Sequence, residues 1–592
     1  MDSRAYDVVI VGLGTAGAWA LKTATDQGLS ALGIERTGGM GGVTTVGVIN
    51  FGGITTNLSQ YETFAESAQA TVAYESVLGS VRMDGRRIAA IRYFTNGVEH
   101  EATAKVFIDA TGRAALARLC GCTVVHGRAF DGEMAPTSGG ETWVETGATT
   151  AGPKYLNVST VELHGDSKDF SKAVQAFRRS RHQQWSSLCK GAKMVRPAAM
   201  MMSREDGSVV TEDTATMADA IAGRVFRDPI FASFDPEDLQ TPYEDKAFES
   251  EEIRNWKFHC DLPMFCYHAT VPYGAIVAKG VDNLFVPSKH LGVAHDLLGS
   301  VRMQGSMRKS AIAAALAAKL AIHYGCTAKE VPYARLRPLL EAAGPLTAPR
   351  ETAVNVYQGV IVDPTKKTRF RFSPYSDAEI VAHLSRDISR TKEWWQGVEA
   401  SGADDECSAY AYYCCWHTGV AGTAAEKASL ADALSAEMSK GNRYAGNFAI
   451  ALALMKDERC LSMLRQIVRN PGGVCDPVVY RAWPNRIKAI DFLGRFQDAE
   501  SVGTLVDIVE DNAVSFVAGL VSAQAFGGTG NDGVCRFQTL SYALMALKSI
   551  LRAHPDAAVA ARLETWRKNF TERIPASDGY DLASRLRKVV FA

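Results

Sequence analysis

The stretch that most constrains how this chain folds is residues 6–45, YDVVIVGLGTAGAWALKTATDQGLSALGIERTGGMGGVTT. It opens with a short apolar run at residues 7–11, which is too uniform for a strand with one exposed face and predicts a central strand of a parallel sheet covered on both sides. The run leads directly into the sequence GLGTAG. Gly12 permits the tight turn, Gly14 lets the backbone approach a pyrophosphate, and Gly17 lets the following helix pack close to the strand.

An acidic residue follows at the distance that a dinucleotide site requires. A second predicted strand, residues 31–34, ends at Glu35 about 20 residues beyond the glycines, where a carboxylate can accept both hydroxyl groups of an adenosine ribose. The first amide groups of the helix that begins at Ala16 would face the phosphates with their partial positive charge. Strand, glycines, helix, strand and acid in this order predict a dinucleotide-binding domain, without deciding between NAD and FAD.

A second glycine-rich passage, RTGGMGGVTT at residues 36–45, is of the kind that lets the backbone lie against a large planar cofactor. With this passage the chain resembles the FAD-dependent oxidoreductases that have a glutathione-reductase-like flavin domain. It looks most like the branch that carries an ER…GG…T.G segment. In that group the first glycines and the Glu bind the ADP half, and the Gly-Gly-x-Thr segment runs along the flavin. The resemblance therefore implies FAD as the cofactor.

Two later segments are similar to the same family. Residues 106–112, VFIDATG, match a strand that returns to the central sheet and carries an ATG near the adenosine and pyrophosphate. Residues 270–321 match a closing segment in which a strand leads to a His, a GS.R sequence and a helix whose N-terminus faces the flavin ring. The sequence departs from that pattern in three places: Ser288-Lys289 replaces Gly-Arg or Gly-Asp, AIAAA replaces a GQAAG-like sequence at residues 311–315, and Arg308 and Lys309 add charges.

The motif and the resemblance together assign a set of residues to FAD. They are Gly12, Gly14, Thr15, Ala16, Gly17, Glu35, Arg36, Gly41, Gly42, Val43, Thr44, Val77, Ala110, Thr111, Gly112, Ser288, Arg302 and Ser306. A helix N-terminus at about residues 305–308, helped by Arg302, would stabilise negative charge on the flavin.

His295, beside the matched GS.R sequence, is the candidate catalytic base, because imidazole titrates near neutrality and can take a hydroxyl proton as hydride leaves the adjacent carbon. A structural or hydrogen-bonding histidine is the alternative. Arg302 and His268 complete the predicted catalytic set, and His290 is a further reserve. Arg204-Glu205 resembles an Arg-Glu pair of the related branch, for which a structural salt bridge competes with substrate contact.

No metal site is predicted. His259, Cys260, Cys266 and His268 could in principle hold zinc, but their spacing matches no established pattern. The strand expected from residue 265 to 273 is more simply interpreted as lining the cavity in front of the flavin. The twelve cysteines are scattered without the spacing of a disulfide scaffold, so reduced thiols are expected.

Charge and hydropathy narrow the classes of partner. The net charge of −1 favours neither nucleic acid nor an anionic membrane surface. The longest apolar helical run, residues 310–322, is interrupted by Lys319 and is too short for a bilayer of roughly 30 Å. No secretory pattern precedes the first strand. We therefore expect a soluble, cytoplasmic protein.

The expected fold class is α/β: a Rossmann-like FAD-binding domain, with a parallel sheet and a β-hairpin, that carries an inserted mixed α+β substrate domain and is followed by an all-α, HEAT-like domain. Residues 447–470 and 484–511 both read as helix, turn, helix, with Asp457 and Asp498 about 40 residues apart in corresponding turns. A third helix pair is expected at residues 537–551 and 556–566. The expected domains are FAD-binding at 1–120 and 270–345, the insertion at 121–269, a linker with a small strand at 346–372, and the helical domain at 373–592.

Three functions fit these features. The leading one is a dehydrogenase or oxidase that transfers a hydride from a CH-OH or CH-CH bond of a small organic substrate to flavin N5. The second is a flavin monooxygenase or ene-reductase that uses an external reductant. The third is a flavin-bearing assembly module whose helical array binds a protein partner or a second copy. The sequence contains no second strand-GxGxxG-helix, which favours an enzyme reduced by its own substrate.

Overall fold

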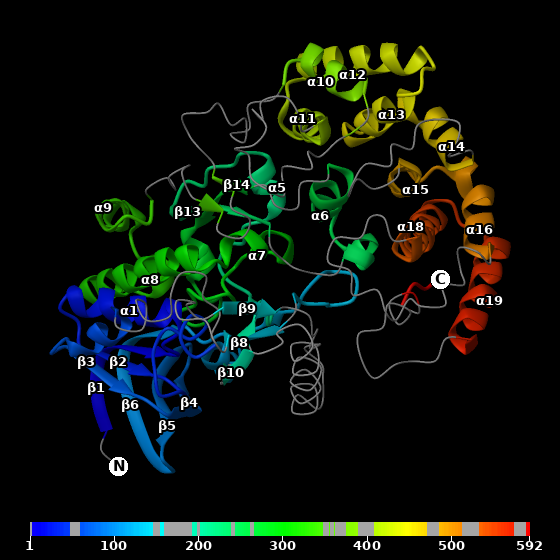
Figure 1. Cartoon of the computed structure of the whole chain (residues 1–592). Coiled ribbons are helices and arrows are strands. Elements are labelled where there is room, and N and C mark those ends of the chain that lie inside the picture. Colours follow the sequence, from blue (N-terminus) through cyan, green and yellow to red (C-terminus); the bar gives the residue numbers. More distant parts are fainter. Residues whose placement is uncertain are drawn as a thin grey trace. The chain divides into compact units, whose positions relative to one another are not determined.

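The computed structural model describes most of the chain in two compact units (Figure 1). The sheet unit comprises Met1–Gly127, Gly132–Gln240 and Cys266–Pro349, and the helical unit comprises Arg128–Asp131, Thr241–Phe265 and Arg350–Ala592. The described residues within them are 3–47, 60–135, 137–145, 154–158, 192–197, 202–237, 243–260, 266–346, 354–355, 360–361, 375–386, 388, 408–469, 485–511, 532–573, 586 and 588–591.

The sheet unit is built on a seven-stranded sheet with the order β3-β2-β1-β6-β5-β4, in which β15 also pairs with β6. Strands β1, β2 and β6 contain the apolar runs that the sequence predicted, and the sheet also contains the expected antiparallel hairpin, formed by β4 and β5. Strand β6 is long enough to pair with β5 along its first half and with β15 near its end. The strands are β1 (Ser3–Val11), β2 (Ala31–Ile34), β3 (Ala70–Ala73), β4 (Ser76–Asp84), β5 (Arg87–Thr95), β6 (Val98–Asp109) and β15 (Leu284–Phe285).

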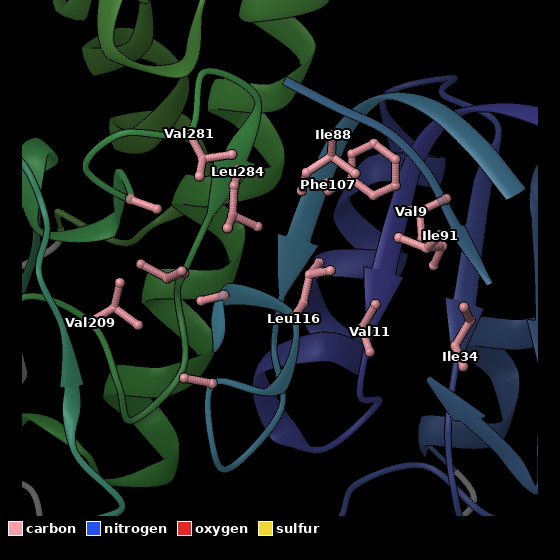
Figure 2. Close-up of a cluster of buried hydrophobic side chains, with 14 of the residues drawn as sticks. Val9, Val11, Ile34, Ile88, Ile91, Phe107, Leu116, Val209, Val281 and Leu284 are labelled. Atoms are coloured by element: carbon pink, nitrogen blue, oxygen red, sulfur yellow. The ribbon is translucent and has the colours of Figure 1, made fainter. Parts of the chain in front are cut away.

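One buried cluster ties the start of the chain to the segment that returns near residue 284. Val9 and Phe107 of the central strands belong to the same cluster as Leu116, Val209 and Leu284 (Figure 2). Burying such side chains contributes about 1.5–3 kcal/mol each, so the returning segment is held to the sheet by packing as well as by strand pairing. Around this sheet, α1 (Thr15–Asp26) packs along α8 (Gln304–Tyr324), and α3 (Ala115–Leu119) carries Leu116.

The described part of residues 121–269 consists of short strands and helices, and its being a separate inserted domain stays a prediction. Strands β13 and β14 pair in antiparallel fashion and pack against α7 and α8. A four-stranded sheet contains β8, β9, β10 and β11, and β7 pairs with β12. The bounds are β7 (Val124–Val125), β8 (Thr137–Glu145), β9 (Lys154–Val158), β10 (Ala192–Pro197), β11 (Met202–Ser203), β12 (Ser208–Val209), α5 (Met217–Ile221), β13 (Pro229–Pro236), β14 (Cys266–Pro272), α7 (His295–Val301) and α9 (Tyr333–Ala343).

The helical unit contains the predicted helix pairs. The turns at Asp457 and Asp498 share one conformation: each aspartate precedes a short 3-10 helix, and each follows a residue with positive φ, Lys456 at 61° and Gln497 at 54°. The HEAT-type classification stays a prediction. The helices are α10 (Asp377–Leu384), α11 (Ser408–Ala421), α12 (Ala424–Ser439), α13 (Ala445–Leu454), α14 (Leu461–Arg469), α15 (Asn485–Arg495), α16 (Val502–Glu510), α18 (Asp532–Ala553) and α19 (Ala557–Arg573).

The division of the chain differs from the predicted domains at one point. The segment between β13 and β14, which the sequence placed in the insertion, folds with the helical unit as η2 (Tyr243–Phe248), α6 (Glu251–Ile253) and the π-helix η3 (Arg254–His259). The chain therefore leaves the sheet unit, contributes to the helical core and returns within one hairpin. In the part of the chain that the structure describes, no helix is both long enough and apolar enough to cross a membrane.

Buried charged side chains connect the segment of residues 241–265 to α15. Asp491 lies 3.4 Å from Arg254 Nε, 2.6 Å from Arg495 and 3.1 Å from His259 Nε2, and Lys488 Nζ donates to the His259 carbonyl at 2.9 Å. Burial alone would raise the pKa of Asp491, but the charges of Arg254 and Arg495 hold it far below the usual range. Asp491 is therefore an aspartate that the folded helical unit keeps ionised.

Candidate functional site

Two of the three glycines of the first loop, Gly12 and Gly17, have contacts that leave no room for a side chain. Gly12 has φ +84°, and a Cβ on it would lie 2.9 Å from Thr111 Cα. A Cβ on Gly17 would lie 1.7 Å from the Gly12 carbonyl oxygen. Gly14, in contrast, faces open space at its Cβ position, and it is the N-cap of α1. Gly12 and Gly17 thus pack against the protein, whereas Gly14, where the sequence predicted the pyrophosphate, has free space beside it.

Substituting Gly17 is expected to remove the cofactor. The Cβ of Gly17→Ala must displace the Gly12 carbonyl, and overpacking of this kind costs about 1–3 kcal/mol, which corresponds to FAD binding weakened about 5–150-fold. The visible flavin absorbance of the purified variant, relative to its protein absorbance, measures the loss. Gly503→Ala is the matched control, because nothing lies within 4 Å of the Cβ that it adds. A variant that retains its full flavin content would contradict the steric argument.

Glu35 is fixed against the same loop. Its side chain is buried, with one carboxylate oxygen accepting from the Leu13 amide at 2.7 Å and the other accepting from the Thr37 amide and hydroxyl at 2.9 and 2.8 Å. The Ser76 amide donates to the Glu35 carbonyl at 2.9 Å, which brings the start of β4 alongside. Val77, which follows Ser76, is an apolar side chain that is 58% exposed. It lies beside Glu35, the acidic residue predicted to bind the ribose. An adenine ring bound there would cover it.

The second glycine-rich passage packs directly on the first. The Gly41 amide donates to the Leu13 carbonyl at 2.8 Å, and Gly14 and Gly41 form an isolated parallel bridge. Gly41 and Gly42 both have positive φ, and a Cβ on Gly42 would lie 3.0 Å from Gly14 Cα. Thr44 is buried, and its hydroxyl donates to the Gly41 carbonyl at 3.0 Å. The two segments that the sequence assigned to FAD therefore form one continuous backbone surface. Arg36 is exposed and Val43 partly exposed at its edge.

The ATG turn is held by an acid that the sequence prediction missed. Asp109 is fully buried; one of its oxygens accepts from the Thr111 amide and hydroxyl at 3.0 and 2.7 Å, and the other accepts from the Ala117 amide at 2.9 Å. Ala110 is buried and Gly112 lies beside Lys289. The signal was present in the sequence as an acid directly before the ATG. Asp109 positions the turn rather than facing a ligand.

Two helices begin with amide groups that no side chain caps. Neither α1 nor α8 has a side-chain cap hydrogen bond or an acidic residue in its first turn, and Thr15 and Ala16 open the first of them. Gly305, in the first turn of α8, faces open space at its Cβ position, as Gly14 does in α1. Helix N-termini of this kind favour bound anions and electron-rich groups. Together with the glycine surface and Glu35, they fit a flavin nucleotide.

His295 is paired with a buried carboxylate. Its Nδ1 lies 2.8 and 3.0 Å from the two oxygens of Glu205, and the side chains are only 7% and 2% exposed. One Glu205 oxygen also accepts from the Ala135 amide at 2.7 Å. His295 is the first residue of α7, and Arg302 is the C-cap residue of that helix, directly before the N-cap of α8. The structure thus joins the predicted base to one half of the Arg-Glu pair.

The other predicted residues occupy distinct places. Ser306 is buried in the first turn of α8, and its hydroxyl donates to Asp235 on β13 at 3.3 Å. Burial raises the pKa of Asp235 to about 6, against the lowering effects of Ser306 and Lys309. His268 lies on β14 opposite Phe234, with ring centroids 4.6 Å apart. Asp235 is a titratable group that the sequence prediction did not include.

The structure also places the reserve histidine and most of the residues that were considered, and rejected, as zinc ligands. Ser288 and His290 are buried, and His290 Nε2 lies 3.9 Å from Asp109 under the ATG turn, where burial lowers the pKa of the imidazole. His259 and Cys260 belong to the helical unit, whereas His268 belongs to the sheet unit. Among the described residues, no three His, Cys, Asp or Glu side chains are grouped so that they could hold a metal ion.

Comparison with known proteins agrees with this geometry. A family model described as FAD dependent oxidoreductase matches residues 54–187 and 139–340, which include the ATG turn, Glu205 and His295. Over these residues, which make up just under half of the chain, the protein is similar to the FAD-dependent oxidoreductases. The cofactor of this oxidoreductase is FAD. None of the curated proteins matches the sequence.

Three solved structures illustrate what parts of this chain resemble. The L-proline dehydrogenase of P. horikoshii is 22% identical over 19% of this chain and 23% of its own, with a TM-score of 0.17. A geranylgeranyl bacteriochlorophyll reductase-like protein of Thermoplasma acidophilum is 12% identical over 58% and 84%, with a TM-score of 0.31. The myxobacterial chondrochloren halogenase is 12% identical over 57% and 79%, with a TM-score of 0.30. The likeness to the FAD-dependent oxidoreductases rests on the family match.

Proposed function

We propose that this oxidoreductase oxidises a CH-OH or CH-CH bond of a small organic substrate and that His295 accepts the proton released in that step. The observation that carries the proposal is the buried pair of His295 and Glu205, in which Nδ1 lies 2.8 Å from the nearer carboxylate oxygen. A carboxylate in this place accepts the Nδ1 proton, so the neutral imidazole presents its Nε2 lone pair to the substrate. Glu205 also stabilises the imidazolium once the proton has been taken.

The N-terminus of α8 supplies the complementary charge. Arg302 and the first amides of α8, which begins at Gln304, bring positive potential to this end of the site. FAD, when bound, accepts the hydride. The glycine surface, Glu35 and the uncapped start of α1 would hold its nucleotide half, and Ser306 and Gly305 belong to the helix start that the resemblance assigns to the ring. The protein's own contribution is to orient the substrate, accept its proton at His295 and stabilise negative charge.

The sheet topology supports reduction by the substrate itself. Among the described residues, every parallel strand pair belongs to the single seven-stranded sheet that carries GLGTAG. A reductase that contained its own NAD(P)H domain would need a second parallel sheet, because such domains are built on one. The alternative, a monooxygenase or ene-reductase, would have to receive electrons from a separate donor.

Anaerobic reduction of the flavin distinguishes these functions. We expect a panel of small alcohols, hydroxy acids and saturated acids to contain compounds that bleach the flavin absorbance of the purified protein without NAD(P)H. The measurement is the flavin spectrum in a sealed cuvette before and after each addition, with the unfolded protein plus free FAD as the control. Bleaching by NAD(P)H or a reductase partner, and by no organic substrate, would instead assign the enzyme to the monooxygenases or ene-reductases.

A further inference from the structure

The first turn of α8 carries a buried hydroxyl group that is bound to a carboxylate of β13. The Ser306 hydroxyl donates to Asp235 Oδ2 at 3.3 Å, and Ser306 is only 2% exposed. One turn further along α8, Lys309 Nζ donates to the Ala232 carbonyl on the same strand at 2.7 Å. Two side chains of α8 therefore hold the beginning of the helix to β13, and Asp235 lies beside it.

The beginning of α8 lies at the same end of the sheet unit as the GLGTAG loop. The Arg308 guanidinium lies 3.7 Å from the centre of the Trp19 ring on α1, and further along both helices Lys319 Nζ donates to Gln27 Oε1 at 2.7 Å. The two helices therefore lie side by side and run in the same direction (Figure 1). Trp19 and Arg308 each belong to the second turn of their helix, so the two N-termini are neighbours. Asp235 thus lies at the end of the unit where the glycine loop would hold the FAD phosphates.

The hydrogen bond of Asp235 differs in kind from those of other buried acids of this unit. Glu35, Asp109 and Glu205 each accept from a backbone amide, which can only donate, so these bonds favour the ionised carboxylate. In the described part of the chain, the Asp235 side chain has one hydrogen-bond partner, the Ser306 hydroxyl. A hydroxyl can donate to a carboxylate or accept from a carboxylic acid. Asp235 can therefore gain a proton and keep its hydrogen bond.

The interface between β13 and α8 contains two more hydroxyl groups. Ser233 lies on the same face of β13 as Asp235, and Ser310 lies one turn beyond Ser306 on α8. Both serines are buried, and neither hydroxyl has a hydrogen-bond partner among the described residues. Burial raises the pKa of Asp235 to about 6, against the lowering effects of Ser306 and Lys309. A small change of charge nearby is therefore enough to alter the protonation of this carboxyl group.

Other titratable groups belong to β13 or to the elements that pack against it. They are His268 on β14, His295 and Asp296 on α7, Arg308 and Lys309 on α8, and Glu237 directly after β13. His268 stacks on Phe234, whose side chain points to the opposite face of β13 from Asp235. Arg308 stacks on α1. The positive charge of Lys309 favours the ionised form of Asp235, and a negative charge on the flavin would act in the opposite direction.

We propose that Asp235 takes up a proton when FAD is reduced and releases it when FAD is reoxidised. A hydride carries two electrons and one proton, so its arrival adds one negative charge to the flavin. Because like charges repel, the reduced flavin makes the ionised form of Asp235 less favourable. One proton from water then converts the carboxylate to a carboxylic acid, and no covalent bond of the substrate changes in this step. Asp235 is thus a charge-balancing residue, distinct from His295, and its role requires FAD but no particular substrate.

The midpoint potential of the flavin, measured across pH in the FAD-loaded, full-length protein, tests this role. Dithionite supplies the electrons, and dyes of known potential serve as references. In a two-electron couple, each proton taken up contributes about 30 mV per pH unit. Above pH 6, where Asp235 is ionised in the oxidised protein, the wild-type potential should fall more steeply than that of Asp235→Asn by this amount. Well below pH 6, Asp235 is protonated in both redox states, and the two plots should run parallel.

Two further variants and a second measurement separate the carboxyl group from the shape of the interface. Asp84→Asn removes an exposed carboxylate at the end of β4 and should match the wild type. Ser306→Ala removes the hydrogen bond to the ionised carboxylate, which raises the pKa of Asp235, so the steep part of the plot should begin at a higher pH. The infrared difference spectrum between reduced and oxidised wild type, recorded above pH 6, should contain a carboxylic acid band that shifts in D2O and is absent from Asp235→Asn.

Two results would overturn the proposal. One is a wild-type infrared difference spectrum in which reduction produces no carboxylic acid band, and this result decides the matter even if Asp235→Asn does not fold. The other is an Asp235→Asn variant whose potential is displaced by the same amount at every pH, because altered packing alone would do this. Both measurements use dithionite rather than an organic substrate. A failure to find the substrate by anaerobic bleaching and a failure of the role of Asp235 are therefore distinguishable.

Discussion

Replacing Asp491 with asparagine is expected to destabilise the helical unit by about 3–5 kcal/mol, because the change removes the buried countercharge of Arg254 and leaves Arg495 with the more exposed Glu251 at 3.5 Å. The asparagine keeps the volume of the side chain and removes only its charge. Asp491 Oδ2 lies 2.6 Å from Arg495 and 3.1 Å from His259, so one substitution affects both α15 and the π-helix η3. Urea unfolding followed by the far-UV circular dichroism of the helices measures the loss.

Glu500→Gln is the matched control for Asp491→Asn. Glu500 pairs with Arg465 at 2.7 Å, but its side chain is 71% exposed, and exposed ion pairs contribute at most about 1 kcal/mol. If Asp491→Asn lowers the free energy of unfolding no more than this control does, the buried charges do not hold residues 241–265 to the helical unit. Loss of the helical signal in both variants would point to a general fragility of the unit.

Acidification should weaken the same network in the wild type. The pKa of Asp491 is held far below its ordinary value, so its stabilising contribution is present above that ordinary value and is lost as the pH falls below it. Burial, with a smaller effect of Arg495, lowers the pKa of His259 to about 3. The unfolded chain therefore takes up a proton at His259 more readily than the folded one. Both groups make the helical unit less stable as the pH falls.

The parts of the site that the sequence predicted are those whose cause is local. A Cβ on Gly17 collides with Gly12 five residues earlier, and Glu35 accepts from the amide of Leu13 inside the motif itself. The same locality explains why the turns at Asp457 and Asp498 could be aligned: each turn conformation is set by its own few residues. The spacing of these residues along the chain is enough to predict the local conformation, so a single sequence suffices for it.

What could not be predicted depends on where distant segments meet. Glu205 and His295 are separated by 90 positions, and nothing in either segment shows that the carboxylate turns toward the imidazole. The sequence marked Arg204-Glu205 only by its resemblance to a pair of the related branch, with a structural salt bridge or substrate contact as its role. The segment that connects β13 to β14, residues 241–265, folds with the helical unit. No periodicity in the sequence marks this change of unit, so the sequence analysis assigned these residues to the insertion. Asp235 was missed because a single aspartate in a strand pattern shows no burial.

The largest effect on catalysis is expected from His295→Gln, which should slow substrate reduction of the flavin about 10²–10⁴-fold, the usual contribution of a positioned acid or base. Glutamine can still accept hydrogen bonds from its neighbours, but it takes up no proton.

Glu205→Gln tests the positioning role of Glu205 separately. The glutamine amide can donate to His295 Nδ1, which favours the wrong tautomer of the imidazole, and the substitution removes the charge that stabilises the imidazolium. We therefore expect the second variant to lose rate and to shift the acid limb of its pH profile. Stopped-flow reduction across pH, at unchanged FAD content, measures both, with His323→Gln at the exposed end of α8 as the control. Full activity in His295→Gln would remove the imidazole from the mechanism and leave Asp235, beside Ser306, as the next group to examine.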